Sequence, residues 1–187
     1  MSARRLGVLT LQGAYAAHAQ VLERLGAQVR PVRLPADFEG LDGLVIPGGE
    51  STTMLRLLER DEMFAALQNY ARHKPCLGTC AGAILLAHQV SPAQASLDIL
   101  DIDVQRNGYG RQLDSAIISG PTALPGGPLE MVFIRAPRFT RIGKDVEVLA
   151  ERDGEAVLVR QGRHLAASFH PELGEDPRVH QAFLDGL

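Results

Sequence analysis

The sequence predicts an α/β fold, a single-domain, three-layer structure with a central, mostly parallel sheet and an antiparallel strand extension in the C-terminal half. Three observations support this fold class. Strand-like segments alternate with helix-like segments up to His88. Beyond His88 the chain is rich in strand-like segments and poor in helices. The 187 residues, 45% of them hydrophobic, suffice for one core, so we expect one domain spanning residues 1–187.

The first half contains the alternating pattern. Four short segments have the apolar content or alternation of strands: Leu6–Leu11, Gln28–Leu34, Asp42–Ile46 and Pro75–Gly78. Apolar residues at helical spacing predict helices at Ala14–Leu25, Ser51–Leu58, Met63–Ala71 and Ala81–His88. Ser51 is a residue type that can cap its helix. Strands that alternate with helices pair in parallel and are covered on both faces.

Strand-like segments dominate the second half. They are Ile99–Val104, Leu113–Ile118, Leu129–Ile134, Val146–Ala150, Ala156–Arg160 and His164–Phe169. Gln161-Gly162 predicts a hairpin turn, and Pro121–Pro128 predicts a loop because it is rich in Gly and Pro. A closing helix is predicted at Pro177–Leu184.

Charge and cysteine content narrow the function classes. The 19 basic and 22 acidic residues give a net charge of −3 and form no long block, which argues against binding nucleic acid or membranes through bulk positive charge. The apolar run before Gln12 is too short for a secretory signal, and no stretch approaches the ~18 apolar residues that span a bilayer. Cys76 and Cys80 are too close for a disulfide framework, so we expect a reducing, cytoplasmic location and packing of Cys76 in the sheet.

Gly78-Thr79-Cys80-Ala81-Gly82 lies where a predicted strand runs into a predicted helix. This spacing is typical of a nucleophile elbow, a sharp turn that needs small flanking residues and raises the nucleophile above the carboxyl edge of the sheet. The helix N-terminus would favour the thiolate form of Cys80, and the Ala81 N–H could stabilise an oxyanion. The alternative is that Cys80 is a small buried side chain in a glycine-rich turn.

A base for Cys80 is predicted at His170. Of the six histidines, only His170 opens a polar loop directly after a strand, and Glu172 follows on that loop. Together, Cys80, His170 and Glu172 provide a nucleophile, a base and a carboxylate that orients the base. For His170 taken alone, a surface loop histidine is the alternative. The other histidines are expected on helix faces or strands: His18, His73, His88, His164 and His180.

The turn Pro47-Gly48-Gly49 ends the third predicted strand. It is not a nucleotide P-loop, because no Gly-Lys-Ser/Thr follows it. Backbone N–H groups of Gly48 and Gly49 beside an elbow could complete an oxyanion hole with that of Ala81. The two cysteines and the scattered histidines lack the paired-ligand spacing of a zinc site, so no metal is expected.

Several segments resemble those of class I (triad) glutamine amidotransferases, whose fold is flavodoxin-like, and within them the glutaminase subunits of two-protein pyridoxal 5′-phosphate synthases. They follow the order of that family and cover essentially the whole chain. They are Leu11-Gln12-Gly13, Ile46–Thr53, Gly78–Ala83, Arg106-Asn107 with Gly110-Arg111-Gln112, Phe133–Pro137 and Phe169–Glu172. The elbow and His-Pro-Glu segments specify the superfamily. The Leu-Gln-Gly, Gly-Gly-Glu-Ser and Phe-Ile-Arg-Ala-Pro segments specify the subfamily.

The resemblance implies hydrolysis of L-glutamine to L-glutamate and ammonia through a thioester on Cys80. His170 would act as acid and base, Glu172 would orient it, and no metal or organic cofactor is needed on this chain. The residues implied in glutamine binding are Gly49, Glu50, Ser51, Arg106, Ile134 and Arg135. On chemical grounds Glu50 suits the substrate ammonium, and Arg106 or Arg135 suits its carboxylate.

The resemblance also implies a partner. In that family a (β/α)₈-barrel synthase subunit receives the ammonia and builds pyridoxal phosphate, and the glutaminase is nearly silent until it docks. A backbone rearrangement at Gly48-Gly49 would then complete the oxyanion hole, with Gln12 near this hole and the interface. Three alternatives stay open. The first is a glutaminase subunit of another biosynthetic amidotransferase, such as imidazole glycerol phosphate synthase, or a free-standing γ-glutamyl hydrolase. The second is a cysteine-elbow stress protein or protease-like α/β chain, although those lack the His-Pro-Glu loop, and the third is a non-enzymatic binding module.

Overall fold

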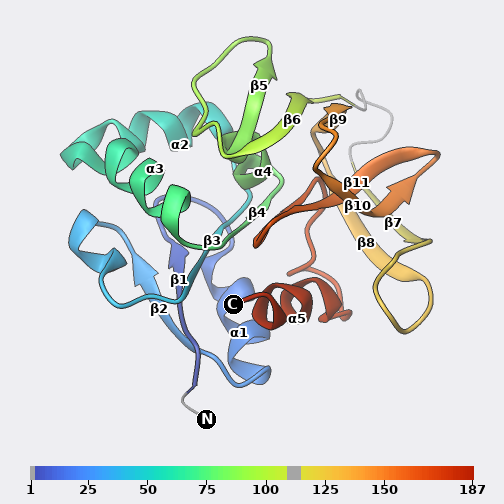
Figure 1. The fold of residues 1–187 in the computed structure, drawn as a ribbon, viewed down its shortest axis with the longest axis horizontal. Helices are drawn as coiled ribbons and strands as arrows, with labels where there is room; N and C mark the ends of the chain where they lie inside the picture. Colours follow the sequence, from blue (N-terminus) through green and yellow to red (C-terminus); the bar gives the residue numbers. More distant parts are fainter. Residues whose placement is uncertain (1–2, 109–114) are drawn as a thin grey trace.

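A computed structural model describes residues 3–108 and 115–187. The motif Gly110-Arg111-Gln112 and the start of the strand predicted at Leu113–Ile118 lie outside the described residues. Within the described residues, the strands form one seven-stranded, one three-stranded and one two-stranded sheet. The seven-stranded sheet occupies the centre of the fold (Figure 1).

The central sheet has the strand order β10-β11-β12-β4-β3-β1-β2. Its parallel part consists of β1 (Arg5–Leu9), β2 (Gln28–Val32), β3 (Gly43–Ile46), β4 (Cys76–Thr79) and β12 (His164–Ala167). Antiparallel pairing adds β10 (Glu147–Arg152) and β11 (Glu155–Gln161), and the predicted turn at Gln161-Gly162 joins β11 to β12. The prediction of a mostly parallel sheet with an antiparallel C-terminal extension is confirmed.

Helices cover both faces of this sheet. Successive side chains of a strand point to opposite faces, so Leu44 and Ile46 of β3 join one core cluster while Val45 joins the other. The helices α1 (Tyr15–Arg24) and α5 (Arg178–Asp185) pack on the Val45 face. The opposite face carries α2 (Ser51–Leu58), α3 (Met63–His73) and α4 (Ala81–Leu86), as Figure 1 shows. The three predicted layers are therefore present, and short 3-10 helices η1 (Pro35–Phe38) and η2 (Arg60–Glu62) lie among the connections.

The cap of α2 differs from the prediction. The helix begins at Ser51, but the residue that caps it is Glu50. The Glu50 carboxylate accepts hydrogen bonds from the backbone N–H of Thr52 at 3.0 Å and of Thr53 at 2.8 Å. Ser51 is buried instead, and its hydroxyl donates to Gln94 Oε1 at 3.1 Å. An anion at this position satisfies two of the free N–H groups of the first turn.

The helix predicted at Ala81–His88 is too long by two residues. It ends at Leu86, and His88 lies on β5 (Ala87–Ser91), where it is exposed and contacts Asp98 at 2.7 Å. β5 pairs with β6 (Leu100–Gln105), which pairs with β9 (Arg138–Ile142). Neither β5 nor β9 was predicted, because a short apolar run such as Ala81–Ala87 has no periodicity that marks where a helix stops.

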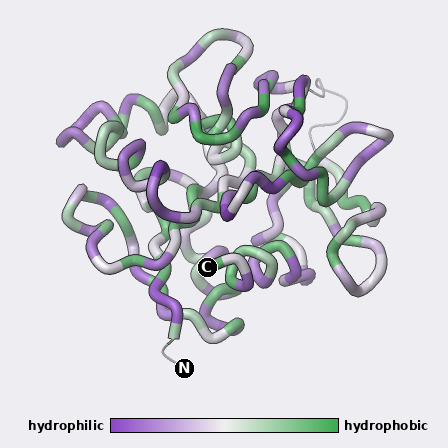
Figure 2. The backbone as a smooth tube through the Cα atoms, viewed as in Figure 1, coloured by the Kyte–Doolittle hydropathy of each residue, from purple (hydrophilic) through white to green (hydrophobic). Residues whose placement is uncertain are grey.

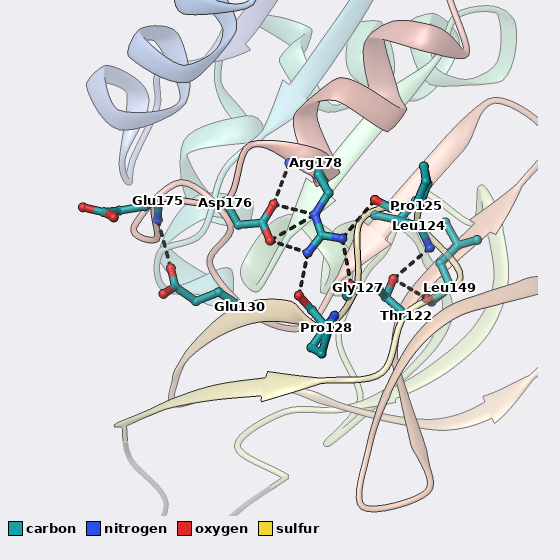
Figure 3. A network of polar contacts seen from close by, with 10 residues as sticks. All are labelled: Thr122, Leu124, Pro125, Gly127, Pro128, Glu130, Leu149, Glu175, Asp176 and Arg178. Carbon is teal, nitrogen blue, oxygen red and sulfur yellow. Dashed lines mark hydrogen bonds and ion pairs between the residues drawn. The ribbon is translucent and has the colours of Figure 1, made fainter.

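Arg178 anchors the Pro121–Pro128 loop, which connects the antiparallel strands β7 (Ser115–Gly120) and β8 (Leu129–Ile134). Its guanidinium donates to the carbonyl oxygens of Pro125 at 3.0 Å, Gly127 at 2.8 Å and Pro128 at 2.6 Å. Asp176 holds the same guanidinium at 2.7 Å (Figure 3). This fixes the loop against the start of α5, the closing helix that the sequence predicts within one residue.

Hydrophobic and hydrophilic stretches alternate along the chain (Figure 2). Among the described residues, no helix is both long enough and apolar enough to cross a membrane.

Candidate active site

Cys80 sits in the turn between β4 and α4. Its backbone has φ 51° and ψ −108°, a strained conformation for a residue with a side chain. The flanking glycines make the turn possible. A Cβ on Gly82 would lie 1.9 Å from the Ile46 carbonyl oxygen, and one on Gly78 would lie 2.6 Å from backbone atoms of Gly82. The predicted elbow geometry is present, and it holds Cys80 at the carboxyl edge of the central sheet.

His170 and Glu172 form a buried pair on the loop after β12. The Nδ1 atom of His170 lies 2.8 Å from Glu172 Oε1, and the Glu172 side chain is completely buried. The His170 backbone N–H donates to the Val132 carbonyl oxygen at 2.8 Å, which fixes the loop to β8. Burial by itself would lower the pKa of His170, but hydrogen bonds with Cys80 and Glu172 outweigh it and raise the pKa well above 6.5. His170 therefore stands as an imidazolium between the Cys80 side chain and the Glu172 carboxylate.

Gly48 brings the nucleophile and the base together. A Cβ at this position would meet His170 Cε1 at 2.6 Å and the Cβ of Cys80 at 3.3 Å. The ring of His170 and the side chain of Cys80 thus pack against the same glycine. His170 therefore lies between Cys80 and Glu172, the order expected of a nucleophile, a base and an orienting acid.

The three residues predicted as oxyanion donors, Gly48, Gly49 and Ala81, lie near Cys80. Ala81 is the first residue of α4, and the first N–H groups of a helix have no partner within it. Gly49 has φ 144°, which a side chain would strain. Gln12 lies against this segment: its Oε1 accepts the Glu50 N–H at 2.9 Å and would be 3.0 Å from a Cβ on Gly49.

A cavity of about 400 Å³ opens onto Cys80 and His170. Its lining contains every residue predicted to bind glutamine: Gly49, Glu50, Ser51, Arg106, Ile134 and Arg135. Ile84 and Asn107 also line it and were not predicted as site residues. Asn107 lies beside Arg106 in a segment that carries the family resemblance, so its place in that segment could have predicted it as a site residue. Ile84 carries no signal, since a helix-face isoleucine looks like any core residue.

The cavity offers groups of both charges. Arg106 has a buried Nε without a hydrogen-bond partner in the described part of the chain, so it can accept an anionic ligand. Hydrogen bonds from the side chains and backbone of Thr52 and Thr53 lower the pKa of Glu50 to about 2 despite slight burial, so Glu50 is anionic. Arg135 lines the same cavity with φ 44°, an uncommon backbone conformation for a non-glycine residue.

The other histidines divide into two groups. His73, His88 and His164 lie away from the cavity lining on a helix or strands. His18 of α1 and His180 of α5 are fully buried, and His18 Nε2 lies 3.5 Å from Glu172 Oε2. The sequence placed both on helices but gave no sign of contact with the carboxylate. Among residues 3–108 and 115–187, no cluster of three His, Cys, Asp or Glu side chains could hold a metal ion.

Comparison with known proteins identifies the family. The model of the SNO glutamine amidotransferase family matches residues 8–187. The chain belongs to that family. The pyridoxal 5′-phosphate synthase subunit PdxT of Koribacter versatilis is 59% identical over 181 residues, which cover 96% of this chain and 94% of the relative.

Two further relatives agree. PdxT of Solibacter usitatus is 50% identical over 193 residues and covers 98% of this chain and 100% of the relative. A crystal structure described as a glutamine amidotransferase superposes with a TM-score of 0.89 at 44% identity and covers 96% of this chain and 97% of that one. The fold class predicted from the sequence is thus that of the family.

Proposed function

We propose that this chain is the glutaminase subunit of a pyridoxal 5′-phosphate synthase, acting as one domain over residues 1–187. It hydrolyses L-glutamine to L-glutamate and ammonia and passes the ammonia to a synthase subunit. The observation that carries the proposal is the line from Cys80 through His170 to Glu172 beside a 400 Å³ cavity with groups of both charges. The relatives named PdxT support the choice of partner.

The chemistry begins with attack of the Cys80 thiolate, whose proton His170 already holds, on the carboxamide carbon of glutamine. The carbonyl oxygen becomes an oxyanion, which the N–H groups of Ala81 and of the Gly48-Gly49 segment stabilise. His170, held as an imidazolium, donates its proton to the departing nitrogen, so that the C–N bond breaks and ammonia leaves. A glutamyl thioester remains on Cys80.

Water completes the cycle. The neutral His170 accepts a proton from the water as the oxygen attacks the thioester carbon. The C–S bond then breaks, glutamate leaves, and the proton returns the Cys80–His170 pair to its starting state. Glu172 keeps the His170 ring in one orientation throughout and stabilises its positive form.

Glutamine is held by its amino-acid end. We assign the substrate ammonium to Glu50, whose carboxylate is fixed at the start of α2. Arg106 is the better candidate for the substrate carboxylate, because its buried Nε is unpartnered within the described chain. Ser51, Ile134 and Arg135 line the rest of the cavity.

The partner supplies the acceptor reaction, and free ammonia must reach it without loss to water. We propose a hetero-oligomer in which docking of the synthase rearranges the Gly48-Gly49 backbone, with Gln12 as the contact that senses it. The free thiol of Cys80 requires a reducing compartment, which fits the cytoplasm. The alternative function is a glutaminase subunit of another biosynthetic amidotransferase, such as imidazole glycerol phosphate synthase.

Glutamate release with and without the synthase subunit tests the proposal. We expect weak turnover by the chain alone, a large increase with the synthase, and loss of turnover in Cys80→Ala. The matched control is Cys76→Ala, which removes the other buried thiol, a core residue of β4. Full turnover without a partner, or activation only by the synthase of a different amidotransferase, would refute the assignment of the partner. Turnover by Cys80→Ala would refute the mechanism.

A further inference from the structure

A buried histidine pair contacts the oxygen of Glu172 that His170 does not use. Glu172 Oε1 faces His170, whereas Oε2 has no hydrogen-bond partner among the described residues and lies 3.5 Å from His18 Nε2. The other nitrogen of His18, Nδ1, lies 2.9 Å from Nε2 of His180. All three side chains are shielded from solvent, so water cannot replace these contacts.

The tautomer of His18 follows from its neighbours. Burial lowers the pKa of His18 to about 4 and that of His180 to about 3, so both rings are neutral and carry one N–H each. An N–H at His18 Nε2 points its positive end at the carboxylate, whereas a lone pair there would face an anion. Nδ1 of His18 then accepts the Nε2–H of His180. This arrangement leaves the His180 Nδ1 lone pair unpaired, which agrees with its lack of a partner among the described residues.

His18 also reaches the nucleophile's strand. With its proton on Nε2, His18 donates a hydrogen bond to the hydroxyl oxygen of Thr79 at 3.2 Å, and Thr79 is the residue directly before Cys80. One ring on α1 therefore contacts both the acid of the triad and the end of β4 from which the elbow rises.

We propose that His18 is a positioning residue of the triad: the dipole of its neutral Nε2–H, 3.5 Å from Oε2 of Glu172, attracts this oxygen and so keeps Oε1 on the His170 ring and the ring directed at Cys80. This inference rests on the triad of the proposed function. A neutral donor suits this role, because it orients the carboxylate without neutralising it. A charged His18 would compete with His170 for the single negative charge of Glu172.

The groups that face Glu172 come from three elements. His170 lies on its own loop, His18 comes from α1 and His180 from α5, and Arg24 adds a positive charge near His180. Of these, only His18 and His170 meet the carboxylate oxygens directly. Loss of the His18 N–H removes a donor from the carboxylate and so favours its protonated form. The rate of Cys80 alkylation falls as the pH is lowered, and this fall, the acid limb of the pH profile, is then expected to begin at a higher pH.

NMR of the histidine rings tests the tautomer. In wild type, ¹⁵N-labelled His18 should show a protonated Nε2 and an unprotonated Nδ1 at neutral pH. The reverse pattern, or a doubly protonated ring, would overturn the proposal. This measurement needs neither glutamine nor the synthase, so it stays informative if the proposed partner is wrong.

Alkylation of Cys80 by iodoacetamide across pH tests the positioning role. Cys76 is buried with a raised pKa, so the label reports Cys80. His18→Leu should slow alkylation at pH 6 by roughly 10-fold and raise the acid limb by about one unit, as loss of a donor to a charged group predicts. His18→Gln, whose amide N–H can reach the same oxygen, should restore most of the wild-type profile. With the synthase present, kcat for glutamine should fall in His18→Leu while KM changes little, because His18 is not in the cavity lining.

A variant of the same helix separates positioning from packing. Leu22→Ala removes an equally buried side chain of α1, one helical turn after His18. It should lower the thermal midpoint at least as much as His18→Leu but leave the acid limb in place. If Leu22→Ala moves the limb as far as His18→Leu does, or if His18→Leu moves it not at all, His18 is a packing residue and the proposal fails.

Discussion

A methyl group on Gly48 should act as a wedge between the nucleophile and the base. The Cβ of a Gly48→Ala variant would lie 2.6 Å from Cε1 of His170 and 3.3 Å from the Cβ of Cys80. The backbone of Gly48 is outside the left-handed region, so alanine brings no backbone strain of its own. In the free subunit, the direct effect of the methyl group is therefore to displace these two side chains.

The structure sets the size of this displacement. An ordinary contact begins near 3.4 Å, so the His170 ring must retreat by about 0.8 Å (3.4 − 2.6 Å) or rotate. A misplacement of roughly 1 Å at a reacting group costs about 100-fold in rate, which equals about 2.7 kcal/mol in the activation free energy. The added methyl should also lower the free energy of unfolding by about 1–3 kcal/mol, as overpacking does.

Two assays measure the effect. The kcat for glutamate release in the presence of the synthase subunit should fall about 100-fold. The rate of Cys80 alkylation at pH 6 should also fall, because the displaced His170 no longer favours the thiolate of Cys80. Gly186→Ala is the matched control, because its Cβ would meet its nearest neighbours at 3.6 Å and its φ is −89°. A kcat for Gly48→Ala within about threefold of wild type, in a folded protein, would refute the geometry of the site.

Other residues give predictions of the same kind. Arg178→Ala should lower the free energy of unfolding in urea by about 2 kcal/mol, because three loop carbonyls lose their donor. The control Arg160→Ala breaks an exposed ion pair and should lower it by under about 0.5 kcal/mol. Equal losses in the two variants would contradict the anchoring role of Arg178. His180 stays neutral in the folded protein, and below pH 6.5 it gains a proton only on unfolding. Between pH 6.5 and 5 the free energy of unfolding of wild type should therefore fall by about 2 kcal/mol more than that of His180→Gln. If the two proteins lose stability in parallel over this range, the pKa of His180 is not lowered in the fold. Arg106→Met should raise KM for glutamine by about 10-fold with a smaller change in kcat, and an unchanged KM would remove Arg106 from the substrate site.

Local patterns predicted most of the elements. The helix at Ser51–Leu58 and the strand at Leu129–Ile134 have the predicted bounds, and α5 is shifted by one residue. These segments have clear periodicity or clear ends. Prediction failed where periodicity is absent: the run of apolar residues after Cys80 hides the end of α4 at Leu86, and Arg138–Ile142 was missed as a strand. In both places pairing with distant strands determines the structure.

The candidate site was predicted in parts of different kinds. The elbow around Cys80 and the loop with His170 and Glu172 are short, local motifs, and the structure supplies the steric reason for the two glycines that flank Cys80. The assignment of Glu50 and Arg106 to glutamine came from family resemblance and stays a prediction. The capping role of Glu50 was missed. Glu50 and Ser51 are neighbours, and only the folded structure decides which of the two side chains bends back to the free N–H groups of the helix.

The sequence by itself determined the fold class, the nucleophile elbow and the loop that carries the base, because these depend on residue spacings of a few positions. Only the tertiary structure decided that β12 pairs with β4, which brings His170 to Cys80. It also decided that His18 and His180, separated by 162 positions, meet behind Glu172. A histidine on a helix face has the same local pattern whether it packs in a core or touches a carboxylate. Its role is set by what the packing of α1 and α5 on the sheet brings against it.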